Sequence, residues 1–468
     1  MLVVVLDTLR PDHLETYGWR RKTAPRLDAL AQDSFVFENA QSAAPLTVAS
    51  LLSLSTSLYP AVHQVQGELN PGRMSENVTT LAEILRARGY ATAAFTEGGY
   101  AKGAFGLDQG FDTFPPNPGD DRSNFSNLVF PSRLAGNVDR TIAWLKEPRT
   151  KPFFVFFHTY EIHSPYRTRE EFVKKVRPWF SEAGDHALVA RVIESWNRSR
   201  LLRPDDALAV LAHPYQCSLE NLPALEAPDE FARAAAAFGL GPDDAVKNDV
   251  VLSLVQDLYD ASILYTDSEL ERLWNALAEL DKTNDTLIVV VSDHGEGLGE
   301  HGEMEHGNVL HEEILHVVFT LHVPKSVNAD GKLAPRRVKE LVRTIDLAPT
   351  LLELLGIDAR REVFQGASLV PLLRGVAEPE RTSFSHARRI DAGQRPQESV
   401  RRGTWRLVRE PETGKRWLYD LATDPGELAD VAAEHPDVVA RLSALPGVDR
   451  AAPQRYLGLP SADRAHGG

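Results

Sequence analysis

The sequence contains a single cysteine, Cys217, among 468 residues. One cysteine excludes an internal disulfide framework and says little about the compartment in which the protein works. No apolar run reaches the roughly 20 residues that a membrane span requires. Basic residues are in the minority, with 51 Lys and Arg against 66 Asp and Glu and a net charge of -15. We therefore expect no membrane span in this chain and no nucleic-acid partner, because phosphate backbones are bound by clustered Lys and Arg.

The first residues also lack the charged region, apolar region and cleavage site of a secretory leader. We expect a cytoplasmic protein if Met1 is the native start, and a periplasmic or extracellular one if a leader is missing. The sequence does not indicate the oligomeric state.

Short apolar runs alternate with helical patterns along most of the chain. The runs that read as strands buried on both faces are residues 2–6, 91–95, 153–157 and 287–291. The helical patterns cover residues 24–33, 81–88, 138–145 and 257–280. This alternation predicts an α/β fold, with a large, mostly parallel sheet between layers of helices.

Two regions depart from this alternation. Residues from about 170 to 250 are polar, interrupted by proline and rich in alanine, so we expect a helical insertion. After residue 358 the segments become Arg-rich and alternating, which predicts a small antiparallel sheet followed by a helix over about 428–442. The sequence thus predicts a catalytic domain over 1–357 and a smaller C-terminal α+β subdomain over 358–468.

Polar residues stand where two of the predicted strands end. Asp7 follows the first strand, and Asp293 and His294 follow the strand at 287–291, while Thr47 opens a predicted helix. Because ligands bind at the carboxyl ends of parallel strands, we expect these side chains to converge. Two carboxylates, an imidazole and a hydroxyl suit one divalent metal ion, with Thr47 as a metal-activated nucleophile. The alternative for Thr47 is a simple helix N-cap, and for Asp7 a cap of the following turn.

The order of motifs resembles the sulfatase family of the alkaline phosphatase superfamily over nearly the full length. The segments that carry the resemblance include VVVLDTLRPDHLETYG, FFVFFHTYEIHSPY, SDHGEGLGEHG, TIDLAPTLLELLGI and LYDLATDPGE. The resemblance implies an alkaline-phosphatase-like fold and a metal-dependent hydrolase of ester bonds. It also implies that Asp7, Thr47, Asp293 and His294 surround the metal.

One position departs from the usual sulfatase pattern. Members of the family typically carry a Cys or Ser that is oxidised to formylglycine, in a Cys-x-Pro-Ser-Arg type motif. The corresponding window here begins at Thr47, and the Arg of the motif has become Leu51. We therefore expect no formylglycine. Threonine at this place resembles phosphoethanolamine transferases, lipoteichoic acid synthases and nucleotide pyrophosphatases, which use it directly as the nucleophile.

A second departure concerns the metal. The second Asp that many sulfatases carry after the first is Thr8 here, so fewer carboxylates are available. This shifts the expectation towards manganese, zinc or magnesium, with calcium still open.

The resemblance also assigns histidines to the substrate. His306 takes the place of a Lys that contacts sulfate, so we expect it to hold the transferred group or to protonate the leaving oxygen. His163 matches a His placed over the substrate, and His158 faces the same edge. His301 and His311 read as incidental surface residues.

Other positions near these motifs have weaker assignments. The family's Lys-x-His pair is not recognisable, and Lys102 in GGYAKGAF is too displaced to take its role. Arg10 and Asp12 are expected to brace the first loop rather than to touch substrate.

These features predict a hydrolase that acts on a phosphate mono- or diester or a phosphonate through Thr47. Phosphoryl substrates are favoured over sulfate esters, because the ordinary ester that Thr47 forms with the transferred group must be broken by direct attack. The substrate would be a small molecule or a lipid or sugar ester. The alternatives are a sulfuric ester hydrolase that works without formylglycine, a phosphoryl transferase, and a family member that has lost catalysis and only binds a ligand.

Overall fold

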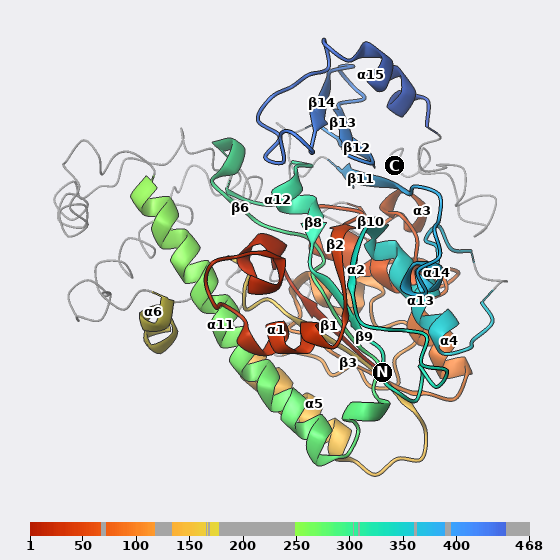
Figure 1. Ribbon diagram of the computed structural model, residues 1–468. Coiled ribbons are helices and arrows are strands. Elements are labelled where there is room, and N and C mark those ends of the chain that lie inside the picture. The colour runs from red at the N-terminus through yellow and green to blue at the C-terminus, as the bar shows by residue number, and fades with distance from the viewer. Residues whose placement is uncertain are drawn as a thin grey trace.

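The computed structural model describes residues 1–66, 72–117, 133–164, 166, 169–176, 249–302, 304–307, 309–359, 363–388 and 395–445 (Figure 1). Its main sheet has eight strands: β1 Leu2–Leu6, β2 Phe35–Gln41, β3 Ala91–Phe95, β4 Phe153–Thr159, β5 Ile288–Val291, β8 His316–Val317, β9 Phe319–His322 and β10 Arg337–Arg343. Their order is β10-β2-β9-β5-β1-β4-β3, with β8 beside β2. β9 runs antiparallel to β5 and β2, and the pairs β1–β4, β1–β5, β3–β4 and β2–β10 are parallel.

Helices lie on both sides of this sheet (Figure 1). They are α1 Pro25–Gln32, α2 Thr47–Thr56, α3 Pro60–His63, α4 Leu81–Ala87, α5 Leu134–Lys146, α6 Glu170–Val176, α11 Asp249–Glu279, α12 Glu312–Leu315, α13 Leu347–Leu354 and α14 Val370–Leu373. Short 3₁₀ turns include η1 Pro11–His13, η3 Gly99–Ala101, η4 Gly103–Phe105 and η9 Glu300–Gly302. The alternating α and β elements confirm the predicted fold class.

The central strand β1 shows why this sequence forms a two-sided sheet. Val3 and Val5 belong to the apolar core that includes α2, α4 and α13, whereas Leu2, Val4 and Leu6 belong to the core that includes α5 and α11. All five side chains are fully buried. Since successive side chains of a strand point to opposite faces, a continuous apolar run fills both cores. Each such side chain contributes about 1.5–3 kcal/mol.

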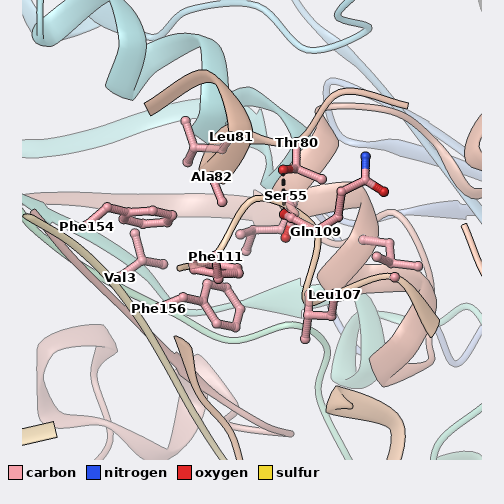
Figure 2. Close-up of a pocket in the computed structure, with 13 residues that line it drawn as sticks. Val3, Ser55, Thr80, Leu81, Ala82, Leu107, Gln109, Phe111, Phe154 and Phe156 are labelled. Carbon is pink, nitrogen blue, oxygen red and sulfur yellow. Dashed lines mark hydrogen bonds between the residues drawn. The ribbon is translucent and has the colours of Figure 1, made fainter. Parts of the chain in front are cut away.

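A small cavity remains in the core beneath α4 (Figure 2). Val3, Phe111, Phe154 and Phe156 form its apolar wall, and on the α4 side the Thr80 hydroxyl donates to the carbonyl of Gln109 at 2.9 Å. None of the residues that line it is a predicted site residue. The cavity is therefore a gap in core packing rather than a candidate for catalysis.

The C-terminal part forms an antiparallel sheet of four strands: β11 Thr382–Ala387, β12 Gln397–Arg402, β13 Trp405–Arg409 and β14 Arg416–Asp420. Helix α15, Pro436–Ser443, packs on it through Val438 and Leu442. The predicted helix over 428–442 therefore begins eight residues too early, because Pro436 lacks an N–H and takes the first helical position. The predicted boundary between 357 and 358 stays a prediction.

Most of the insertion expected over 170–250, including Cys217, lies outside the described residues. No helix in the described part of the chain combines the length and apolarity needed to cross a bilayer.

Candidate metal centre and active site

The register of the central strands places the two aspartates side by side. β1 pairs with β5 in parallel, with Val5 opposite Val291, so the chains that leave these strands carry Asp7 and Asp293 at the same edge of the sheet. Thr8 follows Asp7 with a φ of 59°, a left-handed conformation that is rare for a β-branched residue. The Thr8 N–H donates to Asp293 Oδ1 at 3.3 Å, which ties the two loops together.

Asp7, Asp293 and His294 form a compact and fully buried group, which we call the ligand triad. One ligand atom from each residue lies within 4.8 Å of the others. Among the described residues, Asp7 Oδ1 and Asp293 Oδ2 have no hydrogen-bond partner, although both are buried. Buried carboxylates without partners are costly, and a divalent cation supplies the missing partner. The donor set therefore fits a divalent metal ion, as the sequence predicts.

The electrostatics of Asp7 agree with a cation site. Burial, and after it the facing carboxylate of Asp293, raise the pKa of Asp7 well above its usual value. The nearby Thr47 hydroxyl acts in the opposite direction and lowers the pKa of Asp7. In the absence of a cation these two carboxylates repel each other, and a bound divalent ion removes that repulsion.

Thr47 is the first residue of α2 and is 3% exposed. Its Oγ1 lies 3.3 Å from His294 Nε2. The N-cap of α2 is Leu46, and no side chain caps the helix there. The cap-only alternative for Thr47 is therefore wrong. Instead, the hydroxyl faces the ligand triad at a helix N-terminus, where free N–H groups favour anions.

The histidines predicted to contact substrate lie in one row beside the triad. The His294 and His306 ring centroids are 4.3 Å apart, and those of His306 and His163 are 4.9 Å apart. His306 Nδ1 lies 2.8 Å from Glu296 Oε1 and His163 Nδ1 faces the carbonyl of Ser164. The structure therefore brings Thr47, His306 and His163 to one place, and their catalytic roles stay predictions.

His158 takes a different position from the substrate contact considered for it. It is fully buried, and its Nε2 lies 3.1 Å from Asp7 Oδ2. Burial lowers the pKa of His158, which favours a neutral ring. It is thus a partner of Asp7 rather than a residue on the substrate side. Such an imidazole fixes the orientation of a ligating carboxylate.

Arg10 braces the two ligand loops, as expected. Its Nη1 donates to the carbonyl of Glu296 at 2.9 Å and to Glu300 Oε1 at 2.8 Å, and its Nε and Nη2 hold both oxygens of Asp12. Gly295 packs tightly against the backbone of Glu313. An added Cβ would stand 1.9 Å from the carbonyl oxygen of Glu313, so the position has no room for a side chain.

Two segments depart from the usual sulfatase motifs, and both lie at α2. Leu51 is part of this helix, and GGYAKGAF contains η3, which contacts it. Leu51 is buried in the core beside Val3 and Val5 rather than in the site. Lys102 is 8% exposed, and its Nζ lies 5.5 Å from the centre of the Phe105 ring. η3, which precedes Lys102, packs against α2.

Sequence reasoning missed three acidic residues around the site. Glu296 pairs with His306, and Glu97 accepts hydrogen bonds from Thr159 Oγ1 and from the N–H of Tyr160. Burial raises the pKa of Glu97 to about 7. The third is Glu427 in the C-terminal part, which contacts both His301 and His311. Glu296 stood within SDHGEG and Glu427 at the end of LYDLATDPGE, so both were open to notice, whereas Glu97 lies in none of the quoted motifs.

His301 and His311 are not incidental surface residues. His301 Nδ1 lies 2.8 Å from Glu313 Oε1, and the two imidazole rings stack with centroids 3.9 Å apart. Each side chain is only 16% exposed.

Fold and site together define an α/β protein with a candidate divalent-metal site at the carboxyl edge of its main sheet. Comparison with known proteins makes this more specific. The sulfatase family model matches residues 1–357, and a model of the C-terminal part of N-sulphoglucosamine sulphohydrolase matches residues 299–444. The chain belongs to the sulfatase family, a family of ester hydrolases, and the predicted family is thus confirmed.

Two curated relatives show the range of similarity. Choline-sulfatase of Rhizobium meliloti (strain 1021) is 32% identical over 179 residues, which cover 37% of this chain and 32% of the relative. Human iduronate 2-sulfatase is 25% identical over 407 residues, 76% of this chain and 69% of the relative. This chain therefore spans about a third of one relative and about two thirds of the other.

Solved structures share the fold at low identity. A protein solved in complex with its substrate D-glucosamine-2-N,6-O-disulfate superposes with a TM-score of 0.72 at 17% identity, covering 99% of each chain. The phosphonate monoester hydrolase of Agrobacterium radiobacter has a TM-score of 0.68 at 21% identity, covering 94% of this chain and 93% of that chain. At these identities the likeness establishes the shared fold.

Proposed function

We propose that the protein is a metal-dependent hydrolase of phosphate esters or phosphonates that uses Thr47 as a covalent nucleophile. The observation that carries the proposal is the position of Thr47 Oγ1, 3.3 Å from His294 Nε2 at the N-terminus of α2. A threonine cannot become formylglycine, so on this proposal the hydroxyl itself would supply the attacking oxygen. The fold shared with a phosphonate monoester hydrolase is compatible with such substrates.

Asp7, Asp293 and His294 would hold the metal ion, with Thr47 as a near or direct ligand. A bound divalent cation supplies Lewis acidity for the transferred group and lowers the pKa of the Thr47 hydroxyl. The N–H groups of the first turn of α2 favour the anionic group as it is transferred.

The reaction would consist of two displacements at phosphorus, the first by Thr47 and the second by water. Thr47 Oγ forms a bond to phosphorus while the bond to the leaving oxygen breaks, and in net terms the hydroxyl proton ends on the leaving oxygen. His306, held at Nδ1 by Glu296, would deliver that proton, and His163 would face the transferred group. Water then cleaves the phosphothreonine, returning the proton to Thr47. A sulfate ester of threonine would be formed by the same attack, so sulfate esters remain the second candidate, supported by the curated sulfatase relatives.

The test is Thr47→Ala, assayed on a panel of chromogenic phosphate monoester, diester, phosphonate and sulfate substrates with metal analysis. We expect kcat to fall by about three orders of magnitude or more, as for loss of a covalent nucleophile. The free energy of unfolding should change by no more than about 1 kcal/mol, because Thr47 does not cap the helix. Thr47→Ser should keep part of the activity.

Thr56→Ala is the matched control, because Thr56 is a buried threonine of the same helix whose hydroxyl donates to the carbonyl of Leu52. It should leave kcat unchanged. Turnover by Thr47→Ala at a rate near that of the parent would show that Thr47 is not the nucleophile. Robust sulfate-ester turnover that depends on a formylglycine-generating enzyme would refute the assignment altogether.

A further inference from the structure

Glu427 joins the C-terminal part of the chain to both flanks of the segment that carries His306. It lies after β14, and it is 2% exposed. Its backbone carbonyl lies 3.2 Å from His301 Nε2, and its Oε2 lies 2.9 Å from His311 Nδ1. One residue thus touches positions five residues before and five residues after His306.

The two flanking histidines are themselves in contact. Their rings stack at 3.9 Å with an angle of 11° between planes, and Tyr419 of β14 packs edge-on against His311 at 5.6 Å. Glu427 Oε2 also accepts from the N–H of Glu312 at 2.9 Å, which fixes the start of α12. We call Glu427, His301 and His311 the clip.

Both the backbone and the carboxylate of Glu427 are constrained. Its φ is 52°, a left-handed value that an L-residue adopts at a cost. Its other carboxylate oxygen, Oε1, lies 2.7 Å from Nε of the fully buried Arg406 as an ion pair that is not aligned as a hydrogen bond. The carboxylate is therefore fixed by Arg406 of the C-terminal sheet through one oxygen, and it contacts His311 and Glu312 through the other.

We infer that Glu427 is a positioning residue for catalysis, which sets His306 against the reacting group by clipping the segment at His301 and His311. This inference rests on the proposed function, because it requires His306 to act on the leaving oxygen. His306 lies 4.3 Å from His294 between ring centroids, so a displacement of about 1 Å changes its reach to the leaving group substantially.

The test compares Glu427→Gln with Glu412→Gln, an exposed glutamate in the β13–β14 connection of the same C-terminal sheet. Glu427→Gln should lower kcat about tenfold. KM should change by less than about threefold in either direction. The loss should be greater for esters with poor leaving groups than for p-nitrophenyl esters, because a poor leaving group depends more on the proton from His306. A general loosening of the fold would not produce this leaving-group dependence.

Hydrogen exchange gives a readout that does not depend on turnover. The Glu312 amide donates to Glu427 Oε2, so its exchange should accelerate about tenfold in Glu427→Gln and stay unchanged in Glu412→Gln. If Thr47→Ala remained active, the proposed function would fail while this exchange result could still stand. Faster exchange with kcat and leaving-group dependence equal to those of Glu412→Gln would overturn the positioning role.

A second variant keeps the inference testable if Glu427→Gln does not fold. His311→Gln removes the clip from the side of the catalytic domain and leaves the Arg406–Glu427 pair in place. It should show the same leaving-group-dependent fall in kcat. A folded His311→Gln protein with parental kinetics on poor leaving groups would overturn the inference.

Discussion

Two buried clusters of charged side chains solve the problem of burial in opposite ways. In the ligand triad two carboxylates face each other, and within the described part of the chain an oxygen of each has no hydrogen-bond partner. In the ion cluster, which we define as Glu312, Glu427, Arg401 and Arg406, each carboxylate meets an arginine.

The pKa values reflect this difference. Burial and Asp293 raise the pKa of Asp7, whereas Arg401 and Arg406 lower the pKa of Glu312 to about 2 against the effect of its burial. A carboxylate left without a cation in the fold indicates a place for an external one. A carboxylate matched by arginines indicates structure.

The largest expected effect comes from breaking the triad with Asp7→Asn. Activity should fall by orders of magnitude, because a metal ligand is lost. The metal-free protein should unfold at an equal or higher denaturant concentration, since one of two facing carboxylates is gone. Divalent metal at 100 times its Kd should add about 2.7 kcal/mol to the parent and nothing to the variant. Denaturant unfolding with metal and with chelator measures both, and equal metal stabilisation in the two proteins would contradict the assignment.

Breaking the ion cluster should give the opposite pattern. Arg406→Met leaves Glu427 and Glu312 buried with less compensation, which costs roughly 3–5 kcal/mol of unfolding free energy. The added stability on metal binding should persist, because the triad is intact. Arg416→Met, an exposed arginine of the neighbouring strand β14, is the control and should cost no more than about 0.5 kcal/mol. A stability loss no greater than that of the control would show that the cluster is not structural.

A smaller effect is expected from His301, which contacts Glu313 and, in the ion cluster, Glu427. The hydrogen bond to Glu313 raises the pKa of His301 to about 9, from 6.5. A histidine with a raised pKa in the fold stabilises it fully below pH 6.5, and this contribution disappears as pH rises through 9. His301→Asn should therefore lower Tm at pH 6 and have a diminishing effect towards pH 9.5. A difference in Tm that stays constant over this range would contradict the pairing.

The sequence predicted the features that depend on local pattern. Apolar runs located β1, β3, β4 and β5, and the residues after two of them located the triad, because the ends of parallel strands share an edge. Strand β10 was missed because its charged residues, such as Lys339 and Glu340, are exposed at the edge of the sheet. Its pattern RVKELVR does not form a continuous apolar run.

The rest depended on pairings between distant residues. His301 and His311 read as surface residues because Glu427, which buries them, lies more than a hundred positions away. His158 read as a substrate contact because the strand end was visible, while its hydrogen bond to Asp7 across β1 and β4 was not. Local sequence patterns do not identify such long-range partners.

The pairing of β1 with β5 also has a consequence for biogenesis. Thr8 and Asp293 are 285 positions apart, yet the amide of one reaches the carboxylate of the other. A nascent chain that ends before β5 therefore carries only Asp7 of the ligand triad. Because contacts of such long range form slowly, metal uptake should follow closure of the central sheet and can serve as a kinetic signal for it.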